Sequence, residues 1–364
     1  MSKLIAPRSI DILVVDDSAV VRQALREIIQ AHASFRVLLA ADPYEAVAVM
    51  GKTVPKAIVL DVDMPRMDGL TFLRKLMRQH PLPVILVTDH PARGVAALEL
   101  GALEVIAKPD WRDPNGLATW AEALRESLRL AVGRHEPKTT EMDMRIVAEP
   151  RHGADAVLAR RPYHPHGTAL PPIIAIGAST GGVQSLARLL GQLPREVPGI
   201  VIVQHMPSGF TAAFAERLDR DPGIALDVRE AKSGDPLRPG LALVVPGHLH
   251  GLVRRAPAHF WIELVDGPPV CRHRPSVEVL FRSVAQSAGP RACGVILTGM
   301  GDDGAGGLVE LKDAGGMTFA QDESTSVVFG MPKEAIRRGA ARQVLSLDRI
   351  PGALVAWAQG VPSL

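Results

Sequence analysis

Short apolar runs alternate with longer amphipathic segments along most of this chain. In its first third the apolar runs are DILVV, RVLLA, AIVL, PVILV and EVIA, and the segments between them have the apolar spacing of helices. This alternation predicts five parallel strands with helices on both faces, a doubly wound α/β domain over residues 9–133. Because such sheets collect their chemistry at the carboxyl ends of the strands, the residues directly after each run are candidates for function.

The periodicity fades between residues 134 and 170, a stretch rich in proline, charge and small residues. A structureless stretch of this length is atypical inside a compact domain, so we interpret it as a linker. From residue 171 to 364 the alternation resumes with IIAIGASTGG, GIVIVQH and CGVILTG among its apolar runs. We therefore predict a second doubly wound α/β domain, with a mostly parallel sheet and some antiparallel pairing around LALVV and FWIELV.

The composition limits which binding partners and which cellular compartment we expect for this protein. With 364 residues, of which 47% are hydrophobic, the chain is long enough for two domain cores. A formal charge of +2 gives no reason to expect nucleic acid or an anionic membrane as partner. Cys271 and Cys293 lack the spacing of a disulfide framework or a zinc site, which favours a reducing compartment. Without a signal pattern or a run of about 18 apolar residues, we expect a cytoplasmic, monomeric protein with no membrane insertion.

Polar side chains follow four of the predicted strands in the first domain. They are, in chain order, Asp16 and Asp17, then Asp61, then Thr88, then Lys108. Carboxylates that meet at one edge repel one another and need a cation, and an all-oxygen cluster suits Mg²⁺. Asp61 is then a candidate acceptor of a phosphoryl group, whose charge Thr88 and Lys108 would compensate. Taken singly, each residue is better explained by a helix cap, a turn or a solvated position than by function.

The motif LDVDMPRMDG and the Lys108-Pro109 pair extend this pattern. With them, the segment 16–109 resembles a response-regulator receiver domain, whose fold is flavodoxin-like. The resemblance implies that a histidine kinase phosphorylates Asp61 and that Thr88 and Lys108 sense the phosphoryl group. It also implies a Mg²⁺ site formed by Asp16, Asp17, Asp61 and the carbonyl oxygen of Asp63. One departure is the segment 88–101, which is shorter than receivers usually have there, so how the switch is transmitted stays open.

In the second domain, IIAIGASTGG carries a short apolar run into a glycine-rich turn with one serine. Residues 177–181, GASTG, fit the pattern G-x-S-x-G, which lifts a serine above the edge of a sheet, so Ser179 is a candidate nucleophile. A phosphate or dinucleotide loop is the alternative. The next strand ends in Gln204-His205, whereas a dinucleotide-binding fold has Asp or Glu there to bind the ribose. No G-K-[ST] follows the glycines, as a phosphate-binding P-loop requires. Both observations weaken that alternative.

A nucleophilic serine needs a base, and the base needs a third group to fix its tautomer. His205 ends the strand IVIVQH and shares the edge with Ser179 if the two strands are neighbours. Asp302 and Asp303 follow a later buried strand in GVILTGMGDDGAGG, where one of them can reach the same edge. In that turn the Met300 to Gly301 backbone could aim an N–H at a developing oxyanion.

Other readings of these polar residues stay open. Asp302 and Asp303 could simply cap the following helix. The alternate spacing of His248 and His250 weakly suggests a metal site, although other ligands are missing. His273, between two arginines, could bind a carboxylate or face solvent.

Five motifs in order carry a second resemblance that covers nearly the whole chain. IGASTGG, QHMPSGFT, DGPPVCRHRPSV, LTGMGDDGAGG and VVFGMPKEA, behind a receiver, are similar to the chemotaxis protein-glutamate methylesterases, the CheB family. The resemblance implies that Ser179 is the nucleophile, His205 its base and Asp303 the group that orients the base. It implies that Thr180 and Met300 line the site near the oxyanion and gives Asp302 no catalytic role. The order Ser, His, Asp differs from that of the α/β-hydrolases.

The resemblance also implies a substrate and a control. The substrate would be a glutamate γ-methyl ester on the helical signalling region of chemoreceptors, hydrolysed to glutamate and methanol, with glutamine deamidation as a second activity. The esterase would need no cofactor, and Mg²⁺ would serve receiver phosphorylation. We expect the unphosphorylated receiver to cover the Ser179 site and phosphorylation of Asp61 to relieve this. A docking module that has lost its esterase activity is the rival interpretation.

Overall fold

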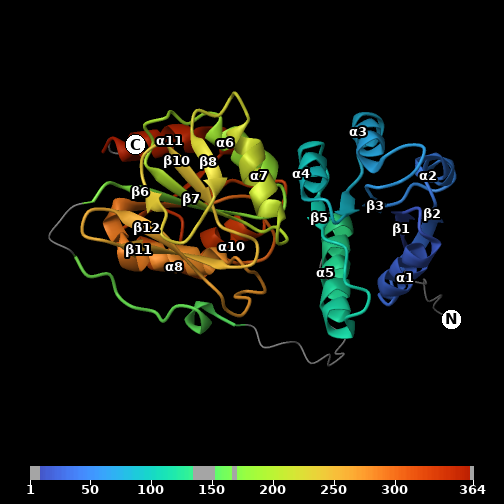
Figure 1. Cartoon of the computed structure of the whole chain (residues 1–364), viewed down its shortest axis with the longest axis horizontal. Coiled ribbons are helices and arrows are strands. Elements are labelled where there is room, and N and C mark those ends of the chain that lie inside the picture. Colours follow the sequence, from blue (N-terminus) through green and yellow to red (C-terminus); the bar gives the residue numbers. More distant parts are fainter. Residues whose placement is uncertain (1–8, 134–151, 166–169, 361–364) are drawn as a thin grey trace, which may run out of the picture. The chain divides into compact units, whose positions relative to one another are not determined.

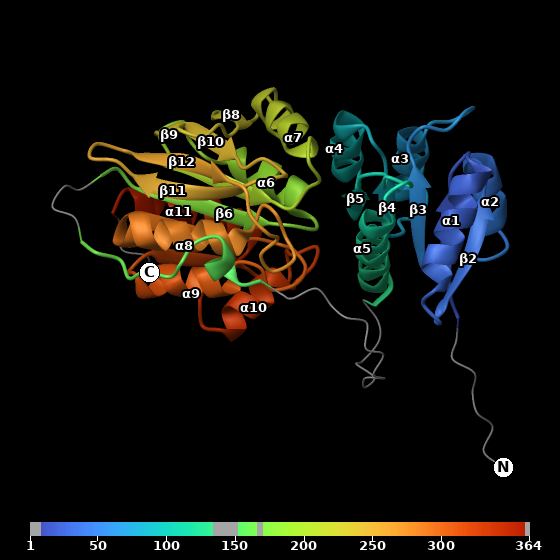
Figure 2. The same cartoon turned by 60° about the horizontal axis from the view of Figure 1, so that its bottom comes forward.

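The computed structural model describes residues 9–133, 152–165 and 170–360. It divides into two compact units, residues 1–144 and 145–364, and each is an α/β domain (Figure 1). Figure 2 shows the same elements turned by 60°, which helps to follow the strands within each unit. Among the described residues, no helix is both long and apolar enough to span a bilayer.

The first unit is built on a parallel sheet of five strands in the order β2-β1-β3-β4-β5. The strands are β1 (Ile10–Val15), β2 (Phe35–Ala40), β3 (Ala57–Asp61), β4 (Val84–Val87) and β5 (Glu104–Ile106). The helices are α1 (Ala19–Gln30), α2 (Pro43–Met50), α3 (Gly69–Gln79), α4 (Pro91–Glu99) and α5 (Pro114–Val132). The predicted five-stranded flavodoxin-like fold is confirmed, because this strand order is the flavodoxin order.

Local sequence explains where these helices begin. The side chains of Ser18, Asp42 and Asp68 accept hydrogen bonds from backbone N–H groups in the first turns of α1, α2 and α3. Serine and aspartate are among the residue types preferred at N-caps. The short segment 88–101 contains the nine-residue helix α4, which has Pro91 in its first turn, where a missing N–H costs nothing.

The second unit holds a sheet of seven strands in the order β15-β14-β13-β6-β7-β10-β8, and every pair in it is parallel. Its strands are β6 (Ile173–Ala178), β7 (Gly199–Gln204), β8 (Asp227–Glu230), β10 (Leu241–Val244), β13 (Ala292–Ile296), β14 (Met317–Gln321) and β15 (Gln343–Leu345). The helices are α6 (Gly182–Leu190), α7 (Phe210–Asp219), α8 (Val277–Ser287), α9 (Ala305–Asp313), α10 (Met331–Arg337) and α11 (Ile350–Ala358). Strand β6 lies centrally. The strands that follow it in sequence are added on its β7 side until β10, and β13 to β15 are added on its other side, so the strand order reverses between β6 and β13, which is where such sheets bind ligands.

A smaller antiparallel sheet in the order β11-β12-β9 accompanies the large one. It consists of β9 (Pro236–Leu237), β11 (His250–Arg255) and β12 (Phe260–Val265). The antiparallel pairing predicted for FWIELV is confirmed, because that segment is β12. The same prediction for LALVV is wrong: its residues 241–244 form β10, parallel to β7 and β8. All four are buried, as is typical of parallel strands covered on both faces.

Residues 152–165, which we call the docked segment, come from the predicted linker but pack within the second unit. Ala154 is buried in a small apolar cluster with Leu252, Val270 and Val279. The guanidinium of Arg282 on α8 donates to Asp155 at 3.0 Å and to the carbonyl oxygen of Leu158 at 2.9 Å. This part of the chain is therefore attached to α8.

Candidate active site

Ser179 lies directly after β6, at the carboxyl end of the central strand. Its backbone N–H donates to the carbonyl oxygen of Thr298 at 3.0 Å, which ties the turn to the loop after β13. A Cβ atom on Gly299 would come within 2.7 Å of the Cβ of Ser179, so only glycine permits this approach of the two loops. Ser179 is half-buried, and two residues later Gly181, with φ +79, is the N-cap of α6.

His205 follows β7, which pairs with β6 as the prediction required. In that register Ala178 lies opposite Gln204, and the N–H of His205 donates to the carbonyl oxygen of Ala178 at 3.1 Å. Ser179 and His205 therefore leave adjacent strands at the same level. The Nε2 atom of His205 lies 2.8 Å from Oδ2 of Asp303. The Nδ1 atom is buried and has no hydrogen-bond partner within the described residues, so it is the nitrogen left to accept a proton.

Asp303 is buried with 1% of its surface exposed and is held from four directions. Besides His205, it accepts hydrogen bonds from the Ser276 hydroxyl at 2.8 Å, the Val277 N–H at 2.8 Å and the Glu278 N–H at 3.0 Å. Burial alone would raise the pKa of Asp303, but the hydrogen bonds with His205 and Ser276 outweigh it and lower the pKa. The carboxylate therefore stays charged at the start of α8, where the helix dipole also favours a negative charge.

The sequence interpretation missed the contribution of Ser276, Val277 and Glu278. These residues begin α8, with Ser276 as its N-cap. A usable signal was present in the sequence, because a proline followed by serine marks a helix start and the N–H groups of a helix start bind anions. What the sequence did not show is that this helix start meets the loop of Asp303.

Two further histidines lie beside the site. The Nδ1 of His250 accepts the N–H of Ser276 at 3.2 Å and its Nε2 lies 3.0 Å from the carbonyl oxygen of Pro268, so both ring nitrogens are in use. This leaves no nitrogen of His250 for the metal alternative, which needed His248 and His250 together. The ring of His273 stacks on that of His205 with 3.7 Å between centroids. Burial lowers the pKa of His273 to about 3, so it is a neutral stacking partner.

The remaining candidates lie in the two loops that meet at Ser179. Thr180 is buried, and its carbonyl oxygen accepts the Thr298 hydroxyl at 2.9 Å. Met300 precedes Gly301 in the loop after β13 and is half-buried. Asp302 forms an ion pair with Arg338 at 2.9 Å, whereas Asp303 points to the imidazole. The structure therefore brings His205 and Asp303 into contact, places Ser179 at the end of the strand next to His205, and directs Asp302 elsewhere.

The polar cluster of the first unit lies at the carboxyl ends of its strands. Asp61 is buried, and the Lys108 ammonium lies 3.1 Å from its carboxylate. Burial raises the pKa of Asp16 to about 6, and the adjacent charge of Asp61 adds to this. The carboxylates of Asp16, Asp17 and Asp61 offer oxygens within 4.8 Å of one another. Three hard oxygen donors whose charges repel one another fit a Mg²⁺ ion.

Two other residues of the predicted phosphorylation site lie around this cluster. Thr88 is fully buried, and its hydroxyl accepts the N–H of His90 at 3.1 Å. The carboxylate of Asp63 lies 3.1 Å from the His90 Nε2 atom and forms an ion pair with Arg93. Its side chain is therefore engaged, and only its carbonyl oxygen is left as a ligand.

The fold and the two sites define a class of protein: a receiver-type domain joined to an α/β domain whose sheet edge carries a serine and, on the next strand, a histidine bound to a buried aspartate. Comparison with known proteins agrees. The family model described as CheB methylesterase matches residues 174–354, and the model of the response regulator receiver domain matches residues 12–116.

Two relatives match almost end to end. The chain is 49% identical over 357 residues to protein-glutamate methylesterase/protein-glutamine glutaminase 5 of Anaeromyxobacter dehalogenans, with 96% of each chain covered. It is 48% identical to the corresponding protein 1 of Xanthomonas oryzae pv. oryzae over 95% of this chain and 100% of that one. The crystal structure of the Thermotoga maritima CheB methylesterase catalytic domain matches 51% of this chain and 98% of that one at 38% identity, with a TM-score of 0.49. The chain belongs to the CheB methylesterase family.

Proposed function

We propose that this protein hydrolyses glutamate γ-methyl esters on chemoreceptors to glutamate and methanol, and that it deamidates receptor glutamines at the same site. The observation that carries the proposal is the His205 imidazole, held by Asp303 at 2.8 Å through Nε2 while Nδ1 has no partner within the described residues. A nitrogen in that state, on the strand next to Ser179, is suited to take the serine proton.

In the proposed reaction each residue has one task. His205 takes the proton of Ser179 as the oxygen attacks the ester carbonyl, and later gives that proton to the departing methoxide, or in the deamidation to the departing amide nitrogen, which leaves as ammonia. A water molecule, deprotonated by His205, then attacks the acyl-serine, and the proton returns to the Ser179 oxygen as glutamate is released. Asp303, kept charged by its hydrogen bonds, stabilises the imidazolium that forms between these steps. Thr180 and Met300 line the place where the oxyanion develops. One donor to such an oxyanion typically contributes about 3 to 4 kcal/mol to the transition state.

The first unit supplies the control in this proposal. A histidine kinase would phosphorylate Asp61 with Mg²⁺ held by Asp16, Asp17, Asp61 and the carbonyl oxygen of Asp63. Lys108, already 3.1 Å from Asp61, and Thr88 would bind the phosphoryl oxygens. Allosteric couplings of 1 to 3 kcal/mol correspond to about 5- to 150-fold activation. In this proposal residues 9–133 receive the signal, 134–170 connect, 171–364 catalyse, and the protein acts in the cytoplasm as a monomer.

Methanol release from methylated receptor tests the proposal directly. We expect Ser179→Ala to abolish it, and Ser324→Ala, which changes an exposed serine, to leave it intact. Unchanged release in Ser179→Ala would refute the role of Ser179. No release by the unchanged protein, despite receptor binding, would favour the docking module instead.

A further inference from the structure

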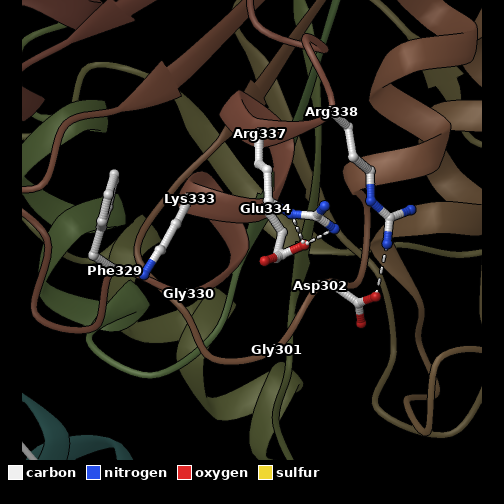
Figure 3. A pocket seen from close by; sticks show the side chains of 8 residues that line it. All are labelled: Gly301, Asp302, Phe329, Gly330, Lys333, Glu334, Arg337 and Arg338. Atoms are coloured by element: carbon white, nitrogen blue, oxygen red, sulfur yellow. Dashed lines mark hydrogen bonds and ion pairs between the residues drawn. The ribbon is translucent and has the colours of Figure 1, made fainter. Parts of the chain in front are cut away.

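The motif VVFGMPKEA, residues 327–335, has no task in the mechanism above, yet it forms one side of a pocket of about 600 Å³. The other side is the loop after β13 that also carries Met300 and Asp303. Figure 3 shows the residues that line it: Gly301, Asp302, Phe329, Gly330, Lys333, Glu334, Arg337 and Arg338. The pocket therefore shares a loop with the candidate active site.

Backbone contacts fix the position of this pocket relative to Ser179. The N–H groups of Gly330 and Met331 donate to the carbonyl oxygen of Gly299 at 3.0 and 2.8 Å, and Phe329 forms a β-bridge with Gly299. Gly299 in turn packs so closely on Ser179 that a Cβ atom would not fit. A polypeptide bound at Ser179 thus has this pocket within reach of its neighbouring residues.

The charges of the pocket are not balanced. Arg337 donates to Glu334 at 2.8 Å, and Arg338 donates to Asp302 at 2.9 Å, so the charge of each arginine is compensated by an ion pair. Lys333 is exposed, and its ammonium forms no ion pair or hydrogen bond with any described residue. In Figure 3 Lys333 lies at the same end of the pocket as Phe329, away from the Arg338–Asp302 pair. One positive charge is therefore left for a ligand.

We propose that Lys333 is a specificity residue that binds a substrate carboxylate one helical turn away from the reacting ester. This inference rests on the proposed function. Residues three or four apart on a helix lie on one face with about 5–6 Å between their Cβ atoms, so a helical substrate presents such a neighbour beside its ester. A single carboxylate suits the pocket better than a phosphate, because Asp302 and Glu334 repel a second negative charge.

The test uses helical peptides that carry one glutamate γ-methyl ester, with Glu or Gln four residues before or after it. With the intact protein we expect the Glu peptide to have a KM about two- to fivefold lower at the same kcat, the range of exposed ion pairs. With Lys333→Gln the Glu and Gln peptides should have the same KM. With Lys333→Glu, a peptide that carries Lys in place of that Glu should become the one with the lower KM. Lys232→Gln, an exposed lysine outside the pocket, keeps it.

Binding separates this inference from the proposed function. In the Ser179→Ala background, peptide affinity is measured without hydrolysis, and the same preference for the Glu peptide should appear, weaken with salt and vanish with Lys333→Gln. If this holds while the intact protein hydrolyses neither peptide, the proposed function fails and the specificity site stands. A preference that is absent, or that survives Lys333→Gln, overturns the inference. The inference is also overturned if inorganic phosphate occupies the pocket at a lower concentration than the Glu peptide does.

Discussion

Glu278 at the start of α8 makes the stability of the second unit depend on pH. Its carboxylate accepts the N–H of Gly306 at 3.0 Å and lies near the charges of Asp303 and Glu310. Burial, reinforced by these two carboxylates, raises the pKa of Glu278 from 4.5 to about 7. The native protein therefore keeps a proton there that the unfolded chain has already lost.

The sign and size of the effect follow from these two pKa values. Below pH 4.5 both states are protonated and Glu278 contributes nothing to the pH dependence. Between pH 4.5 and about 7 only the unfolded state loses its proton, so the free energy of unfolding falls as pH rises. At about 1.36 kcal/mol per pH unit the loss reaches about 3 kcal/mol and stays constant above pH 7. Glu278→Gln keeps the acceptor oxygen without the charge and should remove this loss.

Calorimetric melting of the full-length protein at pH 5, 6, 7 and 8 measures the effect. We expect Glu278→Gln to melt only about 2–3 °C above the unchanged protein at pH 5, where about 0.8 kcal/mol of the loss has developed, and about 6–12 °C above it at pH 8, in the transition of the second unit. Glu323→Gln, at an exposed position, is the matched control and should show no such gain. A melting difference that is the same at every pH would refute the reasoning, because it would not arise from ionisation.

Two further changes probe the sites themselves. Ser276→Ala removes one hydrogen bond to the charged Asp303, a loss of about 1.5–3 kcal/mol. We expect this variant to have a kcat about 10- to 150-fold lower at the same KM. Ser276→Thr keeps the hydroxyl and should restore most of the lost kcat. A full loss in both variants would point to misfolding rather than to positioning. Asp61→Asn should abolish the roughly 5- to 150-fold rise in methanol release caused by a small phosphodonor with Mg²⁺, and a rise that persists would contradict the role of Asp61.

The sequence predicted both parallel sheets because their strands are buried on both faces and are separated by clear helical segments. It also placed Ser179 and His205 on one edge, since strand ends in a parallel sheet share that edge. It could not decide the direction of LALVV, because four buried apolar residues fit either direction of pairing. Nor did it show that the start of α8 binds Asp303, a contact between segments 25 or more residues apart that no local pattern encodes.

The docked segment changes the reach of the connection between the two units. If residues 134–170 were all free to extend, the chain could span at most about 130 Å, whatever its conformation. With the chain fastened to α8 through Asp155 and Leu158, only residues 134–151 separate α5 from the docked segment, and their contour length is at most about 65 Å. Halving a tether raises the local concentration of one module at the other. Arg282, far from Ser179 in sequence, thus helps to set how often the receiver can meet the domain it controls.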